Sequence, residues 1–427
     1  MSEAGTGQGI KKSSCPATAI VIGDGLVGLA CAIELQQRGI TTRLIAPEQP
    51  WRGASWGNAG HLAVEQTAPL ASLATLHSLP RRLFSFGGAA SFPRRAIKYW
   101  LPFSLRLLRR STPSRFRSGK AALAEALATA IPAWQRLLEQ AGGRSLLRLD
   151  GHFIVWEDKA SAAKGMAHWL NSDVGTAHVR RVTASEMADL QALTSTSLAG
   201  AVRVEGSGQI ADMTALGEYL HRYYRQCGGT RISAKVVQIE GEGSQGVATL
   251  ETGEVLRADI LVVAAGTACR DLLAPLGIHA PVIAERGYHI QSDATAWPPA
   301  MPPVVFEDRA MIVTRFADSV RAASFVEFSG ADCPPDPRKW ARLRSHVKAL
   351  ELPVGTAISE WMGIRPTLPD YLPAIGRDAE RPWLAYAFGH QHLGLTLSAT
   401  SGQALGALLC GDRPDFDLKP FSLSRFG

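Results

Sequence analysis

The sequence predicts a two-domain α/β protein, and three observations support this fold class. A short apolar run at 19–22 breaks into the glycine-rich turn GDGLVG (23–28) and resumes with apolar residues at helical period, as expected for a strand, a turn and a helix. Two β-rich runs within 230–259 lead into the buried run ILVVAAG (260–266), which predicts a small meander that returns to the main sheet. A chain of 427 residues is also too long for one simple core.

The glycine-rich turn predicts a dinucleotide site. Gly23 permits the tight turn after the strand, Gly25 lets a pyrophosphate approach the backbone, and Gly28 lets the helix lie close to the strand. The free N–H groups where the helix begins, at Leu26 and Val27, favour an anion. A glycine-rich surface turn is the alternative, but a turn placed between a strand and a helix favours dinucleotide binding.

The acidic residue that usually binds the adenosine ribose is missing from its expected place. The second strand is predicted at 41–45, and the next residue is Ala46. Glu48 lies 20 residues past the third glycine (48 − 28) but follows Pro47, so either Glu48 reaches back or the ribose is held otherwise. The identity of the cofactor therefore has to come from other segments.

Composition narrows the class of protein. A hydrophobic content of 46% with 19% charged residues excludes a disordered chain. The first 16 residues are rich in Gly, Ser and Lys and are expected to be loose. The six cysteines show no CxxC and no metal-ligand spacing, which favours reduced thiols in a cytoplasmic protein without a metal site. The apolar run that follows Lys11 and Lys12 is the predicted dinucleotide strand, so export is not predicted. No apolar segment approaches about 18 residues, so no membrane span is predicted.

The net charge of +7 is concentrated in a basic segment, 81–120, with no Asp or Glu between Glu65 and Glu125. Its middle, AIKYWLPFSLRLLRR, mixes aromatic residues and leucines with the basic ones, as in a surface helix that lies on anionic lipid. A solvated basic face over the substrate domain is an equal alternative, and no recognition motif supports nucleic acid. The basic residues are Arg81, Arg82, Arg94, Arg95, Lys98, Arg106, Arg109, Arg110, Arg115, Arg117 and Lys120.

The remaining chain supplies the expected elements in order. The small, polar segment 53–63 (GASWGNAGHLA) suggests backbone held close to a ligand. An Ala/Leu-rich helix is predicted at about 119–140, and strand-like runs begin near Leu149. Further strands are predicted within 281–330, interrupted by a proline-rich loop near 298–303, and the tail closes with a loop and a helix within 361–409.

Four separated regions resemble the FAD-dependent amine and amino-acid oxidoreductases, which include D-amino-acid dehydrogenase, glycine oxidase and monomeric sarcosine oxidase. The matching pieces are VIGDGLVG, ASWGNAGHLA, ADILVVAAG, and GIRPTLPDYLPAIG followed by GHQHLGLTLSATSG, in the family's order over 19–409. The resemblance implies a Rossmann-like FAD-binding domain with an interleaved mixed-sheet substrate domain of the glycine-oxidase and D-amino-acid-oxidase type. The expected FAD domain comprises 17–80, 200–272 and 358–420, and the substrate domain comprises 81–199 and 273–357.

The resemblance also implies how FAD is held. In the similar enzymes the segment GHQHLGLT (389–396) lies along the pyrimidine edge of the flavin, where N–H groups at a helix N-terminus would stabilise negative charge. FAD is expected to be non-covalent, because no cysteine lies between Cys333 and Cys410, the region where monomeric sarcosine oxidase carries its tethering cysteine. The implied contacts are Ser55 at a phosphate, Asn58, Gly60, His61 and Leu62 in the flavin loop, Val236 at the adenine, and Gly266, Gly389, Leu393, Gly394, Leu395 and Thr396.

The candidate catalytic residues follow from the same resemblance. Arg365 stands in the family's G-[LFI]-R-P pattern, whose arginine takes the substrate carboxylate through its planar fork. A structural salt bridge is the alternative for Arg365. Tyr288 is expected to hydrogen-bond the carboxylate, while His289 or His392 is expected to bind a substrate hydroxyl or assist amine deprotonation, with His61 as a further candidate. Each histidine is equally compatible with a structural role.

The segments NAGHLA, ERGYH and FGHQHLGLTL resemble the D-hydroxyproline dehydrogenase branch of the family. This implies oxidation of cis-4-hydroxy-D-proline or D-proline in hydroxyproline catabolism, by hydride transfer from Cα to flavin N5. The alternatives are a broad-range D-amino-acid dehydrogenase, a glycine or sarcosine oxidase-like enzyme, and a non-autonomous FAD-carrying subunit of a heteromeric dehydrogenase. The basic segment favours a dehydrogenase over an oxidase that uses oxygen. Such a dehydrogenase would be peripheral to the inner face of the cell membrane and would pass electrons to a quinone or respiratory-chain acceptor. The sequence predicts no oligomeric state.

Overall fold

The computed structural model describes residues 15–47, 53–72, 80, 82–294, 296–355 and 358–427. Its helices are α1 (Leu26–Gln37), α3 (Ile97–Arg110), α4 (Pro113–Ala128), α5 (Ala130–Gln140), α6 (Lys159–Asn171), α7 (Ala184–Gln191), α8 (Met213–Gln226), α9 (Cys269–Leu273), α10 (Pro337–Ala349) and α11 (Gly394–Leu409). Its strands are β1 (Thr18–Ile22), β2 (Thr41–Ala46), β3 (His61–Leu62), β4 (Ala90–Ser91), β5 (Leu147–Arg148), β6 (His152–Trp156), β7 (His178–Arg181), β8 (Gly200–Glu205), β9 (Gly208–Ile210), β10 (Thr230–Ser233), β11 (Val236–Glu242), β12 (Gln245–Leu250), β13 (Val255–Ala258), β14 (Ile260–Val263), β15 (Ile283–Asp293), β16 (Val304–Phe306), β17 (Met311–Arg315), β18 (Ser319–Ser329), β19 (Ser359–Thr367), β20 (Ala374–Arg377) and β21 (Leu384–Phe388).

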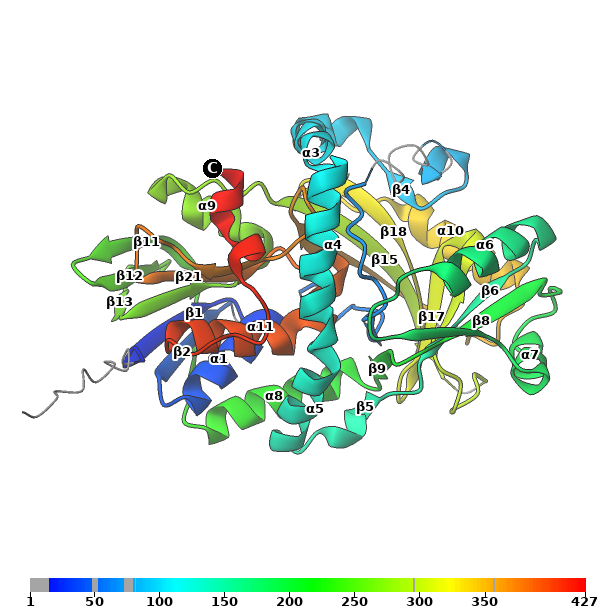
Figure 1. Ribbon diagram of the computed structural model, residues 1–427, viewed down its shortest axis with the longest axis horizontal. Helices are drawn as coiled ribbons and strands as arrows, with labels where there is room; N and C mark the ends of the chain where they lie inside the picture. Colours follow the sequence, from blue (N-terminus) through cyan, green and yellow to red (C-terminus); the bar gives the residue numbers. More distant parts are fainter. Residues whose placement is uncertain (1–14, 48–52, 73–79, 81, 295, 356–357) are drawn as a thin grey trace, which may run out of the picture.

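Two sheets organise the molecule, and the predicted mixed α/β class is confirmed. A six-stranded sheet with α1 and α11 forms one half, a larger sheet with α6, α7 and α10 forms the other, and α4 runs between them (Figure 1). In the smaller sheet the order is β10-β2-β1-β14-β21-β20. The chain leaves β1 for β2 on one side and later returns to β14 on the other, so the carboxyl ends of β1 and β14 form a topological switch point, where ligands bind in such sheets.

Strand β1 is buried because both faces of the sheet are covered. Ala19 and Val21 pack in the cluster that includes α1, α8 and α11, while Ile20 and Ile22 pack against the β11–β13 meander. This double burial explains why the strand reads as a continuous apolar run. Helix α11 lies close on α1, since a Cβ at Gly402 would stand 2.7 Å from the Ala30 carbonyl oxygen. The predicted meander forms as β11, β12 and β13 before the chain enters β14.

The single helix predicted at 119–140 is instead two helices, α4 and α5, with Thr129 between them. Pro132 gives the physical reason, because a proline ring clashes with the carbonyl four residues earlier, here that of Ala128. The Thr129 hydroxyl donates a hydrogen bond of 2.8 Å to the Ala126 carbonyl and so satisfies the end of α4. Each helix then turns its own apolar face to the core.

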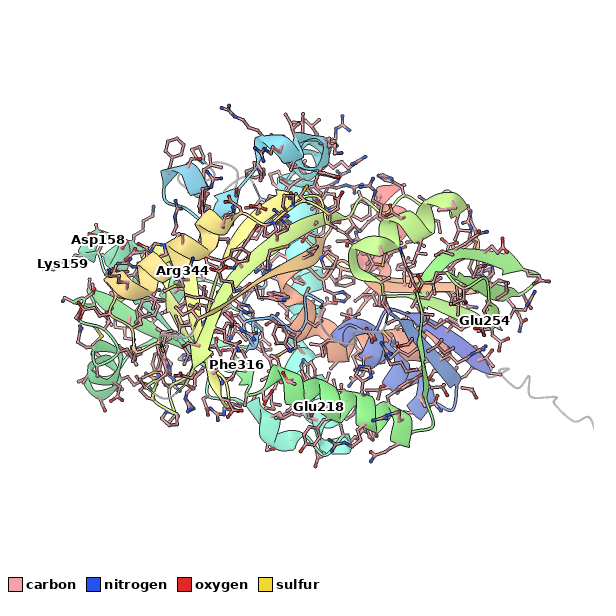
Figure 2. The ribbon with its side chains drawn as sticks, turned by 180° about the vertical axis from the view of Figure 1, so that it is seen from behind. Asp158, Lys159, Glu218, Glu254, Phe316 and Arg344 are labelled. Carbon is pink, nitrogen blue, oxygen red and sulfur yellow. A yellow bond between two sulfur atoms is a disulfide. The ribbon has the colours of Figure 1, made fainter. Side chains whose placement is uncertain are left out.

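The larger sheet has the order β19-β15-β18-β17-β16-β6-β8-β7, with β4 paired to β18. Strands β8 and β19 belong to this sheet although both lie in segments expected to form the FAD domain, and the domain bounds stay a prediction. The two halves meet at Phe316, the residue that directly follows β17. Its side chain packs in the core cluster that also contains the first residues of α8 (Figure 2).

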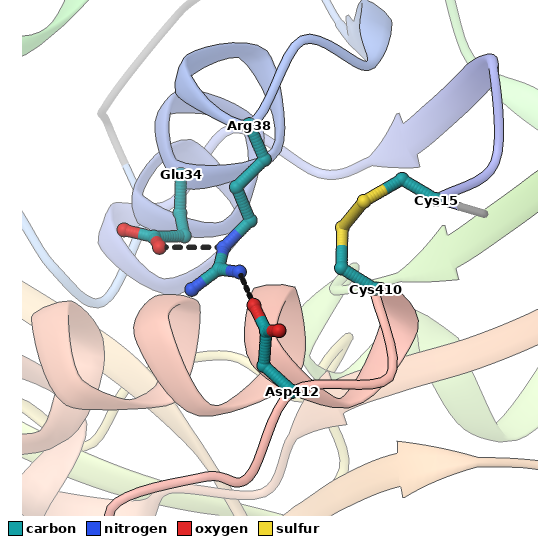
Figure 3. Close-up of a disulfide and its surroundings, with 5 residues drawn as sticks. All are labelled: Cys15, Glu34, Arg38, Cys410 and Asp412. Carbon is teal, nitrogen blue, oxygen red and sulfur yellow. Dashed lines mark hydrogen bonds and ion pairs between the residues drawn. A yellow bond between two sulfur atoms is a disulfide. The ribbon is translucent and has the colours of Figure 1, made fainter. Parts of the chain in front are cut away.

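One prediction about the cysteines is wrong. Cys15 and Cys410 form a disulfide, so these two thiols are not reduced (Figure 3). Residue 15 precedes β1, and Cys410 directly follows α11, so the fold brings together residues that are 395 positions apart. Asp412, beside this pair in Figure 3, accepts a hydrogen bond of 2.7 Å from Arg38. In the described part of the chain, no helix is long and apolar enough to cross a bilayer.

Candidate functional site

The turn after β1 is shaped for close approach of backbone to a ligand. Gly23 has φ +108°, and a Cβ there would stand 2.5 Å from the Ala264 carbonyl oxygen. At Gly28 a Cβ would stand 1.9 Å from the Gly23 oxygen and 3.2 Å from the Ala264 side chain. Because only glycine fits at either position, β1, α1 and the end of β14 come together without side chains between them.

The N-terminus of α1 supplies donors for a phosphate. Gly25 is the N-cap and has no side chain to occupy these donors, and the Leu26 N–H donates to the Ser55 hydroxyl at 3.2 Å. Ser55 therefore lies beside the positive end of the α1 dipole, and its contact with a phosphate stays a prediction. Val236 begins β11 two residues after Ala234, whose N–H donates to the carbonyl of Ala46 at the end of β2 at 3.0 Å. Gly266, with φ +61°, follows β14 at the same edge of the sheet. These residues fit a dinucleotide cofactor.

The edge of β2 holds a charged pair that the sequence did not reveal. Arg231 on β10 donates to the Asp24 carboxylate from Nε and Nη2 at 3.0 and 2.9 Å, and its Nη2 also reaches the Pro47 carbonyl at 2.7 Å. Burial raises the pKa of Asp24, and the Arg231 charge opposes that effect. Ala46, at the end of β2, pairs with Ser233. Glu48, the expected ribose contact, lies outside the described residues.

The loop at 53–63 is held between the two halves of the molecule. Gly60, with φ +74°, donates its N–H to the Asn58 side chain at 2.8 Å and accepts from the Ile210 N–H at 2.8 Å. Arg321 on β18 donates to the Asn58 carbonyl. The Asn58 amide oxygen thus orders the loop backbone, so that its direct role toward a flavin stays a prediction.

The N-terminus of α11 meets the same loop. Thr396 accepts a hydrogen bond of 2.9 Å from the Ala63 N–H, two residues after His61 and next to Leu62. The Leu393 N–H donates to the His390 carbonyl at 2.9 Å, so Gly394 and Leu395 carry the first N–H groups of the helix without an intrahelical acceptor.

The end of β21 sets the entry into α11. Gly389 has φ +80° and a Cβ there would stand 2.6 Å from Leu368, which makes this position specific for glycine. The helix dipole and the N–H groups that have no acceptor within the helix give this terminus electrostatics suited to developing negative charge.

Arg365 on β19 has one edge of its guanidinium occupied and one edge open. Its Nη1 donates to the Glu285 carboxylate at 3.3 Å and to the Phe325 carbonyl at 3.1 Å. Among the described residues, none accepts from Nε or Nη2, and the side chain is 27% exposed. The Nε–Nη2 edge is therefore available for a bidentate carboxylate. The alternative salt bridge is thus present at Nη1, whereas a carboxylate clamp at the open edge stays a prediction.

Glu285 is fixed by further contacts. The Thr367 hydroxyl and the Tyr371 hydroxyl each donate to its second oxygen at 3.1 Å. Beside it, Gly287 leaves room for Arg365, since a Cβ on Gly287 would stand 2.2 Å from Nη2. The guanidinium thus lies close against Gly287, at a position that its neighbours determine.

The alternation of β15 separates two predicted residues. Residues directly opposite on antiparallel strands share a face, so Glu285, Gly287 and His289 lie on the face of Arg365. Tyr288 lies on the other face, where its buried hydroxyl donates to Glu327 and accepts from the Asp336 N–H, each at 3.1 Å. The expectation that Tyr288 binds the substrate carboxylate beside Arg365 is therefore corrected: Tyr288 belongs to the core under α10.

His289 lies on the correct face and is neutral at physiological pH. Burial, followed by the charge of Arg321, lowers its pKa to about 3. Its Nδ1 lies 3.1 Å from the Gly57 carbonyl, which can only accept, so Nδ1 carries the proton and Nε2 is the acceptor. The ring stacks on Trp361 with centroids 5.0 Å apart. His289 is thus an oriented, neutral imidazole.

A cluster around His61 was only partly predicted. The His61 Nε2 lies 3.0 Å from the buried carboxylate of Glu65, and its ring contacts that of His152 edge-on at 4.4 Å. Burial would raise the pKa of Glu65, but the interactions with His61 and His152, together with hydrogen bonds from His61 and the backbone, outweigh it and the net shift is downward. His152 Nδ1 is paired with the Ser207 hydroxyl at 2.9 Å. Side-chain atoms of His61, Glu65 and His152 lie within 4.8 Å of one another, which local sequence spacing indicates only for the first two.

His392 shares this environment with Arg365. Burial and then the Arg365 charge lower the pKa of His392 to about 3. The charge of Glu65 acts to raise this pKa, and that of His61 acts to lower it. His392 thus lies within electrostatic range of Arg365, His61 and Glu65, and the sequence did not single out Glu65.

Comparisons with known proteins show the family and the fold. Residues 18–408 match the model of a family described as "FAD dependent oxidoreductase". A D-amino-acid oxidase of Bradyrhizobium diazoefficiens is 31% identical over 415 residues, which cover 95% of this chain and 98% of the relative. Glycine oxidase from Geobacillus kaustophilus is similar in structure, with a TM-score of 0.71 at 21% identity over 96% of this chain and 98% of that one. L-proline dehydrogenase from P. horikoshii is also similar in structure, with a TM-score of 0.73 at 14% identity over 97% of this chain and 98% of that one.

Proposed function

Because the chain belongs to the family of FAD-dependent oxidoreductases, we propose that this flavoenzyme oxidises a D-amino acid, with cis-4-hydroxy-D-proline and D-proline as the first substrates to test. Enzymes of this family act on amino acids or amines, and FAD is the cofactor. The step from amino acid to a hydroxylated D-proline is the part that requires experiment.

The observation that carries the proposal is the open Nε–Nη2 edge of Arg365. Amino acids share a carboxylate, and a planar fork holds a carboxylate in one orientation through two charge-assisted hydrogen bonds. Glu285 and the Phe325 carbonyl fix the opposite edge of the same guanidinium. Substrate orientation therefore costs little rearrangement of the protein.

Two neutral histidines favour a substrate with a polar group on its ring. His289 shares the sheet face of Arg365, and His392 lies within the field of the Arg365 charge. With pKa values of about 3, both are neutral imidazoles that can accept a hydrogen bond from a hydroxyl or an amine. A pocket for glycine or sarcosine would have no need of such partners.

Bound FAD would supply the two-electron acceptor for this reaction. The residues of this chain that fit it are Gly23, Gly28 and Ser55 at the pyrophosphate and the N-terminus of α11 at the flavin. Each offers backbone or hydroxyl donors, which would hold the cofactor without a covalent bond.

An anaerobic spectrum of the purified holoenzyme tests the proposal. We expect cis-4-hydroxy-D-proline to bleach the flavin absorption, and Arg365→Ala to raise KM strongly while FAD stays bound. Unchanged steady-state kinetics in that variant would remove Arg365 from the role of clamp.

A broad-range D-amino-acid oxidase is the second candidate, favoured by the 31% identical relative. Faster bleaching by D-alanine than by cis-4-hydroxy-D-proline would establish it. A protein that binds FAD but bleaches with no amino acid on its own would instead indicate a subunit of a heteromeric dehydrogenase. Reoxidation of the bleached enzyme by oxygen or by a quinone analogue then identifies the acceptor, for which we propose a quinone.

A further inference from the structure

Helix α3 presents an apolar stripe to solvent. Ile97, Leu101, Leu105 and Leu108 are 49%, 43%, 51% and 50% exposed. Their spacing of four, four and three residues places them within an arc of about 80° on a helix with 3.6 residues per turn. Four adjacent aliphatic side chains on one face differ from scattered surface hydrophobics, which are normal, and mark a site that something covers.

The opposite face of α3 is firmly packed, so the direction of the stripe is fixed. Phe103 is 4% exposed and stacks on Phe328 with ring centroids 5.6 Å apart. Trp100 packs in the same cluster and donates from Nε1 to the Pro93 carbonyl at 2.9 Å. The helix lies at the edge of the molecule in Figure 1, with its outer face away from the two sheets.

Basic side chains flank the stripe on one side. Arg94, Arg95, Lys98, Arg106 and Arg109 are all exposed. In the described part of the chain, no carboxylate forms an ion pair with any of these five. Leucines next to uncompensated positive charges form the pattern of a helix that lies in the interface of an anionic bilayer.

A basic cavity opens beside the last turn of α3. Its volume is about 180 Å³, and it is lined by Arg106, Arg109, Arg110, His279, Pro281 and Phe426. The Arg110 guanidinium stacks on the Phe426 ring at 5.0 Å and donates to the Arg425 carbonyl at 2.5 Å. The nearby carboxylate of Asp370 is already bound by Arg425 at 2.7 Å. Burial and the charge of Arg115 lower the pKa of Arg110, as expected where positive charges crowd together. An anion in this cavity would relieve that repulsion.

We propose that α3 docks the protein on the surface of an anionic phospholipid bilayer, with the leucine stripe among the acyl chains and the phosphodiester of one lipid in the arginine-lined cavity. Charge complementarity selects this occupant. A nucleic acid would meet the same charges but leave the leucines in water. A second copy of the chain would bring one basic face against another across a two-fold axis.

Vesicle co-sedimentation of the full-length holoenzyme tests the proposal. We expect binding to vesicles of phosphatidylcholine with one quarter phosphatidylglycerol and none to phosphatidylcholine alone. Arg106→Gln with Arg109→Gln should weaken binding about 25-fold, because each basic residue near an anionic surface contributes about fivefold. Leu101→Ser with Leu105→Ser should weaken it more than tenfold. The flavin spectrum of each variant reports that the fold is intact.

Matched controls change the same residue types elsewhere on the surface. Val237→Ser with Val255→Ser removes exposed aliphatic groups from the meander, and Arg222→Gln with Arg225→Gln removes exposed charges from α8. Neither control should alter binding. Equal loss in the two arginine variants would overturn the proposal, since it would show binding by net charge alone. Equal loss in the leucine and valine variants would overturn it too, since it would show that the position of the exposed aliphatic groups does not matter.

Other occupants give distinct results. Three results would each overturn the proposal in favour of another occupant. The first is a dimer of the wild type that the leucine variant abolishes, and the second is RNA binding that depends on Arg106 and Arg109. The third is thermal stabilisation by inorganic phosphate without vesicle binding. The readout needs no turnover, so it succeeds or fails independently of the substrate assignment.

Discussion

Gly287→Ala is the most selective test of the Arg365 clamp. A Cβ at this position would stand 2.2 Å from Nη2 and 2.5 Å from Cζ of Arg365. Ordinary contact begins near 3.4 Å, so the guanidinium has to move by about 1.2 Å (3.4 − 2.2). The atoms in conflict are the flexible end of a side chain, so the fold tolerates the change, with a cost of about 1 to 3 kcal/mol at most.

The functional cost should be larger than the structural one. Two charge-assisted hydrogen bonds to a carboxylate are worth about 1.5 to 3 kcal/mol each. Loss of about 2.7 kcal/mol of binding free energy, roughly the contribution of one of the two hydrogen bonds, raises a dissociation constant about 10²-fold. We therefore expect the Kd for substrate in the anaerobic reductive half-reaction to rise about 10²-fold in Gly287→Ala, while the FAD content stays that of the wild type. Arg365→Lys, which keeps the charge but loses the fork, should behave in the same way.

Gly119→Ala is the matched control. It makes the same chemical change on α4, where the new Cβ would meet its nearest neighbour, Pro69, at 3.5 Å, an ordinary contact. Substrate affinity should not change in this variant. If Gly287→Ala and Arg365→Lys both keep the affinity of the wild type, Arg365 is a structural residue and the carboxylate binds elsewhere.

Three further predictions concern the cofactor edge, the buried histidines and the disulfide. Arg231→Gln should weaken FAD binding, because Asp24 would lose its charged partner at the end of β2. A fluorescence titration of the apoprotein with FAD measures this, and an unchanged affinity would exclude a role of Arg231 at the ribose. His152, His289, His390 and His392 have folded-state pKa values lowered to about 3, below the value of 6.5 for an exposed histidine, so their contribution to stability is complete above pH 6.5 and is lost as the pH falls toward 3. Thermal unfolding should show that each of these histidines lowers the free energy of unfolding by about 1 to 2 kcal/mol between pH 7 and 5. A free energy of unfolding that does not change with pH over this range would contradict this. Cys410→Ser should lower Tm relative to Cys227→Ser, since the disulfide closes a loop of 395 residues and the chain-entropy estimate gives an upper bound of about 6 kcal/mol; equal values of Tm would contradict it.

The sequence predicted the cofactor turn well because its geometry is local. Residues 18–28 contain a strand, three glycines and a helix start, and each has a steric reason that acts within a few residues. The proline that divides α4 from α5 also acts locally and could have been recognised at 132. The amphipathic character of α3 was likewise visible as mixed leucines and arginines.

Tyr288 shows where such reasoning ends. Alternation along β15 separates Tyr288 from Gly287 and His289, but it does not say which face meets the rest of the molecule. That choice depends on the packing of α10 over one face and on the pairing with β19, which carries Arg365. A tyrosine beside the right motif was therefore assigned to the wrong side of the sheet.

By itself the sequence determined the dinucleotide turn, the arginine motif, the family resemblance and the basic character of residues 81–120, because each is written in residues close together along the chain. The tertiary structure decided which edge of Arg365 is open and that Glu65 and His152 lie beside His61. It also placed Arg231 against the Pro47 carbonyl, next to Ala46, and Cys15 against Cys410. It also decided which face of α3 is exposed. These features join residues tens to hundreds of positions apart, and only the packing of the two sheets brings them within contact distance.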